Sequence, residues 1–364
     1  MMMSAFRSDI KKMTVAWLRC IFLLSCIMCI FTGCSQTSFR GPGPAQTGPG
    51  SSEYEHGALT YARFRKKEFQ YFIFTPCDPV PERAPVIVLL HGWGAMSPYR
   101  YGAWIEHLVR RGNIVIYPRM QSSITTDNGG LTYTALDSIR HALGTLDKGA
   151  VKPDMERFAV VGHSAGGNAA VNVAALAASR NIPVFKAVMC VQPGLEYSKS
   201  GRKWTVLEDL SLVPEETLLL ITLGDRDDFV KGTDARKIFL RTGSIPLENK
   251  GYVMLVSDDY GVPVLEASHQ CAQCPDSRFR LPLGRCSDER PPAGTIVPLV
   301  PSPYPGKYVN ALDYYGLWKL FDGLYEAAFY GKNREYALGN TDRQRYMGMW
   351  EDGTPVREIQ NINP

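Results

Sequence analysis

Histidine is scarce in this chain, and no charge of one sign, internal repeat or long hydrophobic run dominates it. The net charge of +4 over 364 residues comes from 40 basic and 36 acidic side chains, and the basic ones are scattered. A charge this small and this dispersed does not favour a nucleic-acid-binding protein. The absence of a repeat argues against solenoids and propellers. With 45% hydrophobic residues, the chain has enough apolar side chains for one large buried core.

The most informative stretch is Gly162-His163-Ser164-Ala165-Gly166. An apolar run at 157–161 precedes it, and an alanine-rich helical pattern follows. A strand that turns sharply into a helix needs glycines around the turn, because side chains there would clash. The serine at the apex then presents its hydroxyl as a candidate nucleophile. The alternative is an ordinary serine in a glycine-rich turn.

A serine hydroxyl needs a base to take its proton, a third group to orient the base, and donors for the developing oxyanion. Six histidines are present, and only His269 follows Ser164 in the chain. If the order is serine, acid, histidine, His269 is the single candidate for the base. The side chain of His163 should point off the turn, and His91 belongs to a different motif. The alternative for His269 is an isolated exposed histidine.

Three carboxylates compete for the role of the acid. A continuous apolar run at 217–223 is typical of a buried parallel strand, and Asp225, Asp227 and Asp228 follow it directly. Asp258 and Asp259, after the next strand, are more remote candidates. The residues alone leave this choice open.

The oxyanion donors are expected from two backbone N–H groups. One belongs to Ala165, the residue after the nucleophile. The other comes from the loop after the strand pattern at 85–90, where His91-Gly92-Trp93-Gly94 follows. We expect the N–H of Trp93 to be the second donor, with the two glycines letting the loop bend. His91 is then a structural histidine that holds this loop.

Strand and helix patterns alternate along the chain, which predicts a parallel sheet with crossover helices. Active sites in such sheets lie at the carboxyl ends of the strands, where all the candidates above are found. The strand patterns fall near 58–64, 69–74, 86–90, 114–117, 158–161, 187–191, 218–223 and 252–256, and the helical ones near 101–111, 133–146, 166–178, 235–240 and 310–330.

With these motifs in this order, residues from 61 to 330 resemble an α/β-hydrolase. The chain is most similar to bacterial secreted esterases, lipases, and cutinase-like and chlorophyllase-like enzymes. The resemblance implies the α/β-hydrolase fold, a mostly parallel sheet of about eight strands with helices on both faces. It also favours Asp227 as the acid, because Gly224-x-x-Asp227-x-x-Val230 has the spacing of the acid loop in such enzymes. Asp225 is the second choice.

The same resemblance implies the reaction. Ser164, Asp227 and His269 would form a catalytic triad that hydrolyses carboxylic esters through an acyl-serine intermediate, with Trp93 and Ala165 as the oxyanion hole. No metal or organic cofactor is required. Two alternatives stay open: a peptidase or amidase that uses the same triad, and a non-catalytic surface protein that kept the fold.

The N-terminus predicts export. Basic residues precede an apolar run at 20–31 that is too short for a membrane span, and Gly33-Cys34 follows. This resembles a lipoprotein signal peptide over 1–33 with lipidation of Cys34, and an ordinary cleaved signal or an uncleaved anchor is the alternative. A flexible tether over 34–57 and a catalytic domain over 58–364, with a C-terminal extension from residue 270, would follow. We expect a lipid-anchored protein of the bacterial cell envelope that meets a small-molecule or lipid ester; the oligomeric state stays open.

Cysteine usage fits an exported protein. Cys190 lies in an apolar run and is expected to be a buried free thiol. Cys271, Cys274 and Cys286 crowd the loop after His269, where at least one disulfide would stiffen the loop. The pairing, which could also involve Cys77, is open, and zinc bound by the three clustered cysteines is the alternative.

Overall fold

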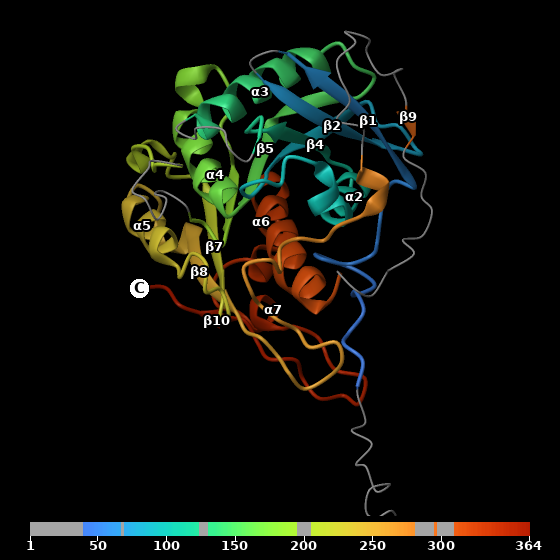
Figure 1. The fold of residues 1–364 in the computed structure, drawn as a ribbon, viewed down its shortest axis with the longest axis vertical. Helices are drawn as coiled ribbons and strands as arrows, with labels where there is room; N and C mark the ends of the chain where they lie inside the picture. Colours follow the sequence, from blue (N-terminus) through green and yellow to red (C-terminus); the bar gives the residue numbers. More distant parts are fainter. Residues whose placement is uncertain (1–38, 67–68, 124–129, 195–204, 281–294, 297–308) are drawn as a thin grey trace, which may run out of the picture. The chain divides into compact units, whose positions relative to one another are not determined.

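The computed structural model describes residues 39–66, 69–123, 130–194, 205–280, 295–296 and 309–364 (Figure 1). The predicted signal peptide, Cys34 and Cys286 lie outside these residues. Among the helices in the described ranges, none is both long and apolar enough to cross a bilayer.

The described strands form one sheet in the order β10-β8-β7-β6-β5-β3-β4-β2-β1-β9. Strands β3 to β8 pair in parallel, while β1, β2, β9 and β10 pair antiparallel at the two edges. The mostly parallel sheet is as predicted, and the eight expected strands correspond to β1–β8. The strands are β1 (Ala58–Arg65), β2 (Gln70–Cys77), β3 (Arg83–Leu90), β4 (Ile114–Arg119), β5 (Lys152–His163), β6 (Ala187–Val191), β7 (Leu218–Gly224), β8 (Lys250–Leu255), β9 (Thr295–Ile296) and β10 (Gln360–Asn361).

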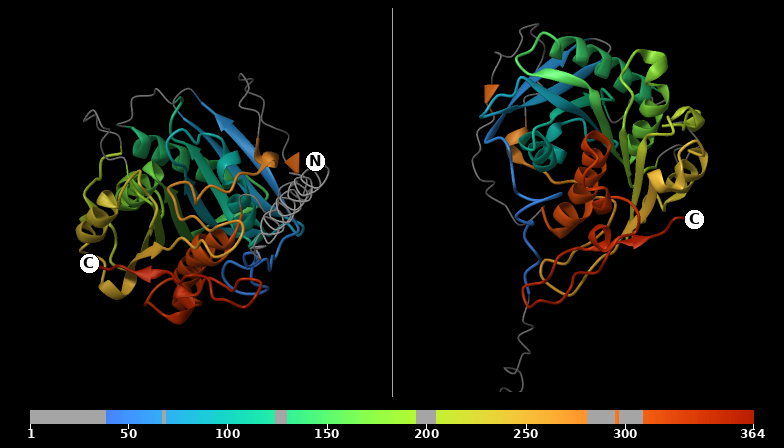
Figure 2. Two further views of the ribbon diagram at one scale, coloured as in Figure 1. Left: turned by 60° about the horizontal axis from the view of Figure 1, so that its bottom comes forward. Right: turned by 180° about the vertical axis from the view of Figure 1, so that it is seen from behind.

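Helices cover both faces of the sheet, as Figures 1 and 2 show. Side chains alternate along β3: Ile87 and Leu89 join one apolar cluster, while Val86, Val88 and Leu90 join the other. The first cluster includes α2 (Gly102–Arg110), the π-helix η6 (Leu312–Trp318) and α6 (Lys319–Tyr330). The second includes α3 (Leu131–Leu146), α4 (Ala165–Leu176) and α5 (Thr233–Arg241). The prediction of helices on both faces is confirmed.

Short helical turns complete the described chain. They are η1 (Pro98–Tyr101), η2 (Ala178–Arg180), η3 (Leu210–Leu212), η4 (Leu247–Asn249), η5 (Ser277–Phe279), η7 (Arg334–Tyr336) and α7 (Asp342–Arg345). In the C-terminal tail, Trp350 is 2% exposed and donates its indole N–H to Asp258 Oδ2 at 3.2 Å.

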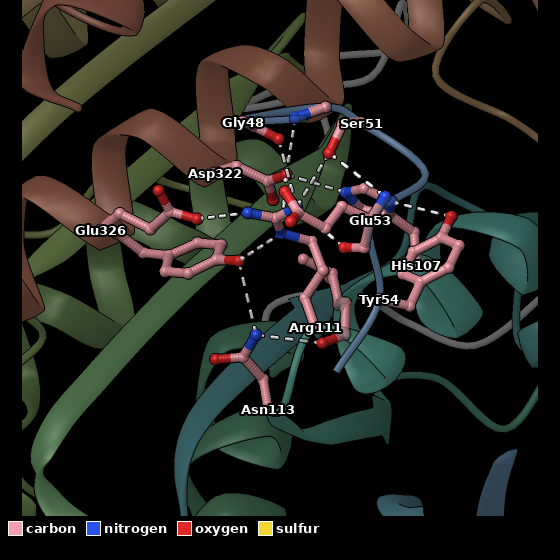
Figure 3. Close-up of polar contacts among 12 residues, drawn as sticks. Gly48, Ser51, Glu53, Tyr54, His107, Arg111, Asn113, Asp322 and Glu326 are labelled. Carbon is pink, nitrogen blue, oxygen red and sulfur yellow. Dashed lines mark hydrogen bonds and ion pairs between the residues drawn. The ribbon is translucent and has the colours of Figure 1, made fainter. Parts of the chain in front are cut away.

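Residues 39–57 do not form the flexible tether that their glycines and prolines predict. They belong to the same compact unit as the rest of the described chain. Gly50 N–H donates to Asp322 Oδ2 at 2.8 Å, Arg111 donates to the carbonyl of Gly48 at 3.2 Å, and the hydroxyl of Tyr54 lies 3.3 Å from His107 Nδ1 (Figure 3). The prediction is wrong for these residues because buried partners on α2 and α6, far away in the sequence, hold the segment.

Asp322 is the buried acceptor that joins residues 39–57 to the rest of the structure. Its Oδ2 accepts from His107 Nε2 at 2.8 Å and from Arg111 Nε at 3.2 Å, in addition to the Gly50 N–H (Figure 3). Burial alone would raise the pKa of Asp322, but the charges of Arg111 and His107 and these hydrogen bonds lower it below its usual value. The carboxylate is therefore ionised, and it joins the N-terminal segment to both helices.

Candidate active site

Ser164 lies at a sharp turn between β5 and α4. Its backbone has φ 57° and ψ −122°, a strained conformation for a residue with a side chain. The flanking glycines are sterically required: a Cβ on Gly162 would lie 1.9 Å from the carbonyl oxygen of Gly166, and one on Gly166 would lie 2.2 Å from that of Leu90. The strand–turn–helix arrangement predicted from the motif is thus present.

The structure brings Ser164, His269 and Asp227 together. Ser164 Oγ lies 3.0 Å from His269 Nε2, and His269 Nδ1 lies 2.8 Å from Asp227 Oδ2. The three residues are 3%, 8% and 8% exposed, respectively. Because the carboxylate can only accept at Nδ1, the neutral imidazole carries its proton there and presents the Nε2 lone pair to the serine hydroxyl.

The carboxylate of Asp227 is also anchored by its own loop. Its Oδ1 accepts the backbone N–H of Phe229 at 3.0 Å and that of Val230 at 3.1 Å. Burial would raise the pKa of Asp227, but the hydrogen bond and charge of His269, together with the two backbone N–H groups, lower it below its usual value. Asp227 is therefore held as an anion in a fixed orientation.

The rival acids have other partners. Asp225 Oδ1 accepts the backbone N–H of Ser257 at 3.0 Å and also binds its hydroxyl at 2.5 Å. Asp259 forms an ion pair with Arg226, and Asp258 accepts from the tail. Among the candidates in the described structure, Asp227 is the one whose carboxylate forms a hydrogen bond with the imidazole of His269.

The loop after β3 lies close to Ser164. A Cβ on Gly92 would lie 3.3 Å from Ser164 Cβ, so a glycine there lets the backbone come close. His91 holds the loop: its Nε2 accepts the backbone N–H of Met120 at 3.1 Å, and its Nδ1 donates to the carbonyl of Gly92 at 2.8 Å. Burial lowers the pKa of His91 to about 4, so it is neutral and has no free ring nitrogen for acid–base work. Trp93 follows Gly92 in this loop. Ala165 follows Ser164 and is the first residue of α4.

Sequence reasoning missed several residues that shape the site. Gln192, at a positive φ of 45°, donates its amide to the carbonyl of Ser268 at 2.8 Å and so supports the loop of His269. Phe229 is 62% exposed, and its ring centroid lies 4.8 Å from that of His269. No local motif marks these residues; the position of Phe229 two residues after Asp227 is the one signal that could have drawn attention to it.

The two described cysteines near His269 do not form the disulfide that the sequence predicts. Cys77, Cys190, Cys271 and Cys274 are free thiols, so the described pair near His269 forms no disulfide. The thiol of Cys271 lies 3.9 Å from Gln192 Oε1, whereas Cys274 packs into the apolar core. The two side chains thus have separate partners. Cys190 is buried and free, as expected.

Comparison with known protein families finds that the chlorophyllase family model matches residues 66–208. The match includes the loop after β3 and the turn at Ser164, and it ends before Asp227 and His269. Comparison with curated proteins finds no match. The family match indicates a hydrolase acting on esters, and the sheet order and the turn at Ser164 agree with it. Over residues 66–208 the chain is thus similar to the chlorophyllase family, and its mostly parallel sheet is consistent with the α/β-hydrolase fold.

Proposed function

We propose that this protein is a serine-dependent carboxylic-ester hydrolase that works through an acyl-serine intermediate. The observation that carries the proposal is the continuous hydrogen-bonded line from Ser164 Oγ through His269 to Asp227, at 3.0 and 2.8 Å. These distances lie within the range needed for direct proton transfer between the nucleophile and its base.

In the proposed reaction, His269 Nε2 takes the hydroxyl proton as Ser164 Oγ attacks the ester carbonyl carbon. Asp227 keeps the imidazole in the correct tautomer and stabilises the imidazolium that forms. His269 then returns the proton to the leaving alcohol as the carbon–oxygen bond breaks. A water molecule, activated by the same imidazole, attacks the acyl-enzyme, and Ser164 regains its proton when the carboxylic acid leaves.

The tetrahedral intermediate carries an oxyanion, and we assign its donors to the backbone N–H groups of Ala165 and Trp93. Ala165 is the first residue of α4, where N–H groups have no acceptor within the helix. Gly92 lets the neighbouring loop approach Ser164, since a Cβ at this position would lie 3.3 Å from Ser164 Cβ. Donors on both sides of the serine would stabilise the charge as it develops.

The substrate class is a small-molecule or lipid ester. Phe229 supports this assignment, because a 62% exposed aromatic ring beside His269 offers an apolar surface at the reacting centre. Such a surface can accept an acyl chain or an apolar alcohol, the two parts of an ester.

The N-terminal sequence supports export and lipidation at Cys34, which would hold the enzyme on the cell envelope. Intact-mass analysis of the membrane fraction tests this: acyl groups on Cys34 are expected, and a soluble mature chain with an unmodified Cys34 would reject the anchor. This outcome is independent of the chemistry at Ser164.

The catalytic proposal is tested by hydrolysis of short-chain p-nitrophenyl esters by the purified full-length protein, with Ser164→Ala as the matched variant. Wild-type turnover is expected, with a loss to the background rate in the variant. Equal rates in the two proteins would reject the assignment. A parallel p-nitroanilide series separates ester from amide hydrolysis, and a preference for the anilide would favour an amidase.

A further inference from the structure

A buried series of hydrogen bonds, here called the relay, joins two loops. One is the loop after β3, residues 91–94, here called the oxyanion loop, and the other is the loop that carries His269, residues 266–270, here called the base loop. Gly92 N–H donates to Tyr101 Oη at 3.0 Å, and Tyr101 Oη lies 2.8 Å from His163 Nδ1. His163 Nε2 in turn lies 2.8 Å from the backbone carbonyl oxygen of His269. Tyr101 is 0% and His163 3% exposed, so water does not compete for these groups.

One proton arrangement satisfies every group in this relay. The carbonyl oxygen of His269 can only accept, so the proton of the neutral His163 ring lies on Nε2. Nδ1 is then an acceptor, and the hydroxyl proton of Tyr101 points to it. The lone pair of that hydroxyl accepts the N–H of Gly92. The direction of donation therefore runs unbroken from the oxyanion loop to the base loop.

The neutrality of His163 matters because its ring centroid lies 4.9 Å from that of His269. Burial and the charge of His269 lower the pKa of His163 to about 3, against the opposing effects of the bond to the His269 carbonyl and of Asp227. Burial also raises the pKa of Tyr101, which stays protonated. The relay thus adds no positive charge beside the imidazolium that forms on His269 during the proposed reaction.

We propose that Tyr101 and His163 are positioning residues that hold the oxyanion loop and the base loop at a fixed separation on either side of Ser164. The inference rests on the proposed esterase function and names two residues that transfer no proton in the reaction. His163 acts through the backbone of His269, and Tyr101 acts through Gly92 and His163. Loss of the relay leaves the triad residues present but less well placed, and displacements of about 1 Å cost on the order of 100-fold in rate.

The test measures how fast a fluorophosphonate probe labels Ser164 in the full-length protein. Ser164 Oγ forms a bond to phosphorus, fluoride leaves, and His269 takes the proton, so the rate reports on the site without knowledge of the natural ester. Tyr101→Phe is expected to slow labelling roughly 10- to 100-fold. Tyr71→Phe is the matched control, because Tyr71 is also 0% exposed and its hydroxyl lies 2.6 Å from His141 Nδ1. It should lose comparable thermal stability but keep the labelling rate.

Two variants at His163 separate positioning from packing and from proton transfer. His163→Gln supplies one donor and one acceptor and cannot titrate, so it should keep the wild-type pH profile and label much faster than His163→Leu. Equal slowing by Tyr101→Phe and Tyr71→Phe, equal rates in the two His163 variants, or a pH profile altered by His163→Gln would overturn the inference. If wild-type Ser164 is not labelled at all, the proposed function fails and the inference with it; if wild type and Tyr101→Phe label equally fast, only the inference fails.

Discussion

The two buried neutral histidines beside the site make a quantitative prediction about acid stability. His91 is 0% and His163 3% exposed, and burial lowers their pKa values to about 4 and about 3. In the unfolded chain both side chains should have a pKa of about 6.5. The folded-state pKa is therefore below the unfolded one. Each group contributes its full stability above about pH 6.5 and loses it as the pH falls toward the folded-state pKa.

The magnitude follows from the proton uptake of the unfolded chain. Between pH 7.5 and pH 5.0 the folded state leaves both rings neutral, whereas the unfolded state protonates them almost completely. At about 1.36 kcal/mol for each pKa unit, this loss is about 2 kcal/mol for each histidine and about 4 kcal/mol for both. That is a large share of the roughly 5–15 kcal/mol that stabilises a typical domain.

Guanidinium chloride unfolding at the two pH values, followed by tryptophan fluorescence and circular dichroism, measures the loss. His91→Gln and His163→Gln should each reduce the difference between the two pH values by about 2 kcal/mol, because each removes one such group. Each variant is compared with itself, so any general destabilisation cancels. A wild-type stability that does not change between pH 7.5 and 5.0, or a loss that is the same in wild type and both variants, would refute the reasoning.

Three further predictions concern single side chains. Asp227→Asn should lower kcat for ester hydrolysis by about 10⁴-fold, because the amide favours the wrong tautomer of the imidazole. Asp225→Asn should keep most of the wild-type kcat. The opposite order would assign the role of the acid to Asp225. Asp322→Ala should destabilise the fold by about 3–5 kcal/mol in thermal unfolding, because Arg111 loses its buried anion and the His107 ring and the Gly50 N–H lose their acceptor. The exposed Asp342→Ala should leave the melting temperature unchanged, and equal effects of the two changes would contradict the central role of Asp322. Gly92→Ala should lower kcat without unfolding the protein, because the added Cβ would lie 3.0 Å from His163 Nδ1 and 3.3 Å from Ser164 Cβ. An unchanged kcat would contradict this prediction and show that the loop can move away from Ser164.

Much of the fold could be predicted from periodicity. The continuous apolar runs at 86–90 and 218–223 became β3 and β7, because strands buried on both faces need no alternation of polar residues. The two-residue strands β9 and β10 could not be found, since two residues carry no pattern. The π-helical turn at Leu312–Trp318 likewise cannot be told from ordinary helix in the sequence, because its side-chain periodicity differs little over seven residues.

The errors had long-range causes. Glycine and proline between residues 41 and 49 predicted a flexible segment, and nothing local reveals that Arg111 and Asp322 bind it. The serine and the base could be proposed from a motif and from chain order. For the acid, the residues alone left Asp225 and Asp227 open because both follow the same strand, and the family resemblance favoured Asp227. In the structure the two differ in orientation, since Asp227 faces His269 and Asp225 binds Ser257. The hydroxyl of Tyr101 is likewise brought to the site by tertiary packing.

The most direct measurement of the central claim is the mass of the protein during turnover. Acid quenching of the full-length protein with a p-nitrophenyl ester in excess, followed by peptide mass analysis, should place one acyl group on the peptide that contains Ser164. The adduct should be absent in Ser164→Ala, which lacks the attacking hydroxyl. Sustained turnover with no adduct on Ser164, or with the acyl group on another residue, would contradict an acyl-serine mechanism at this site.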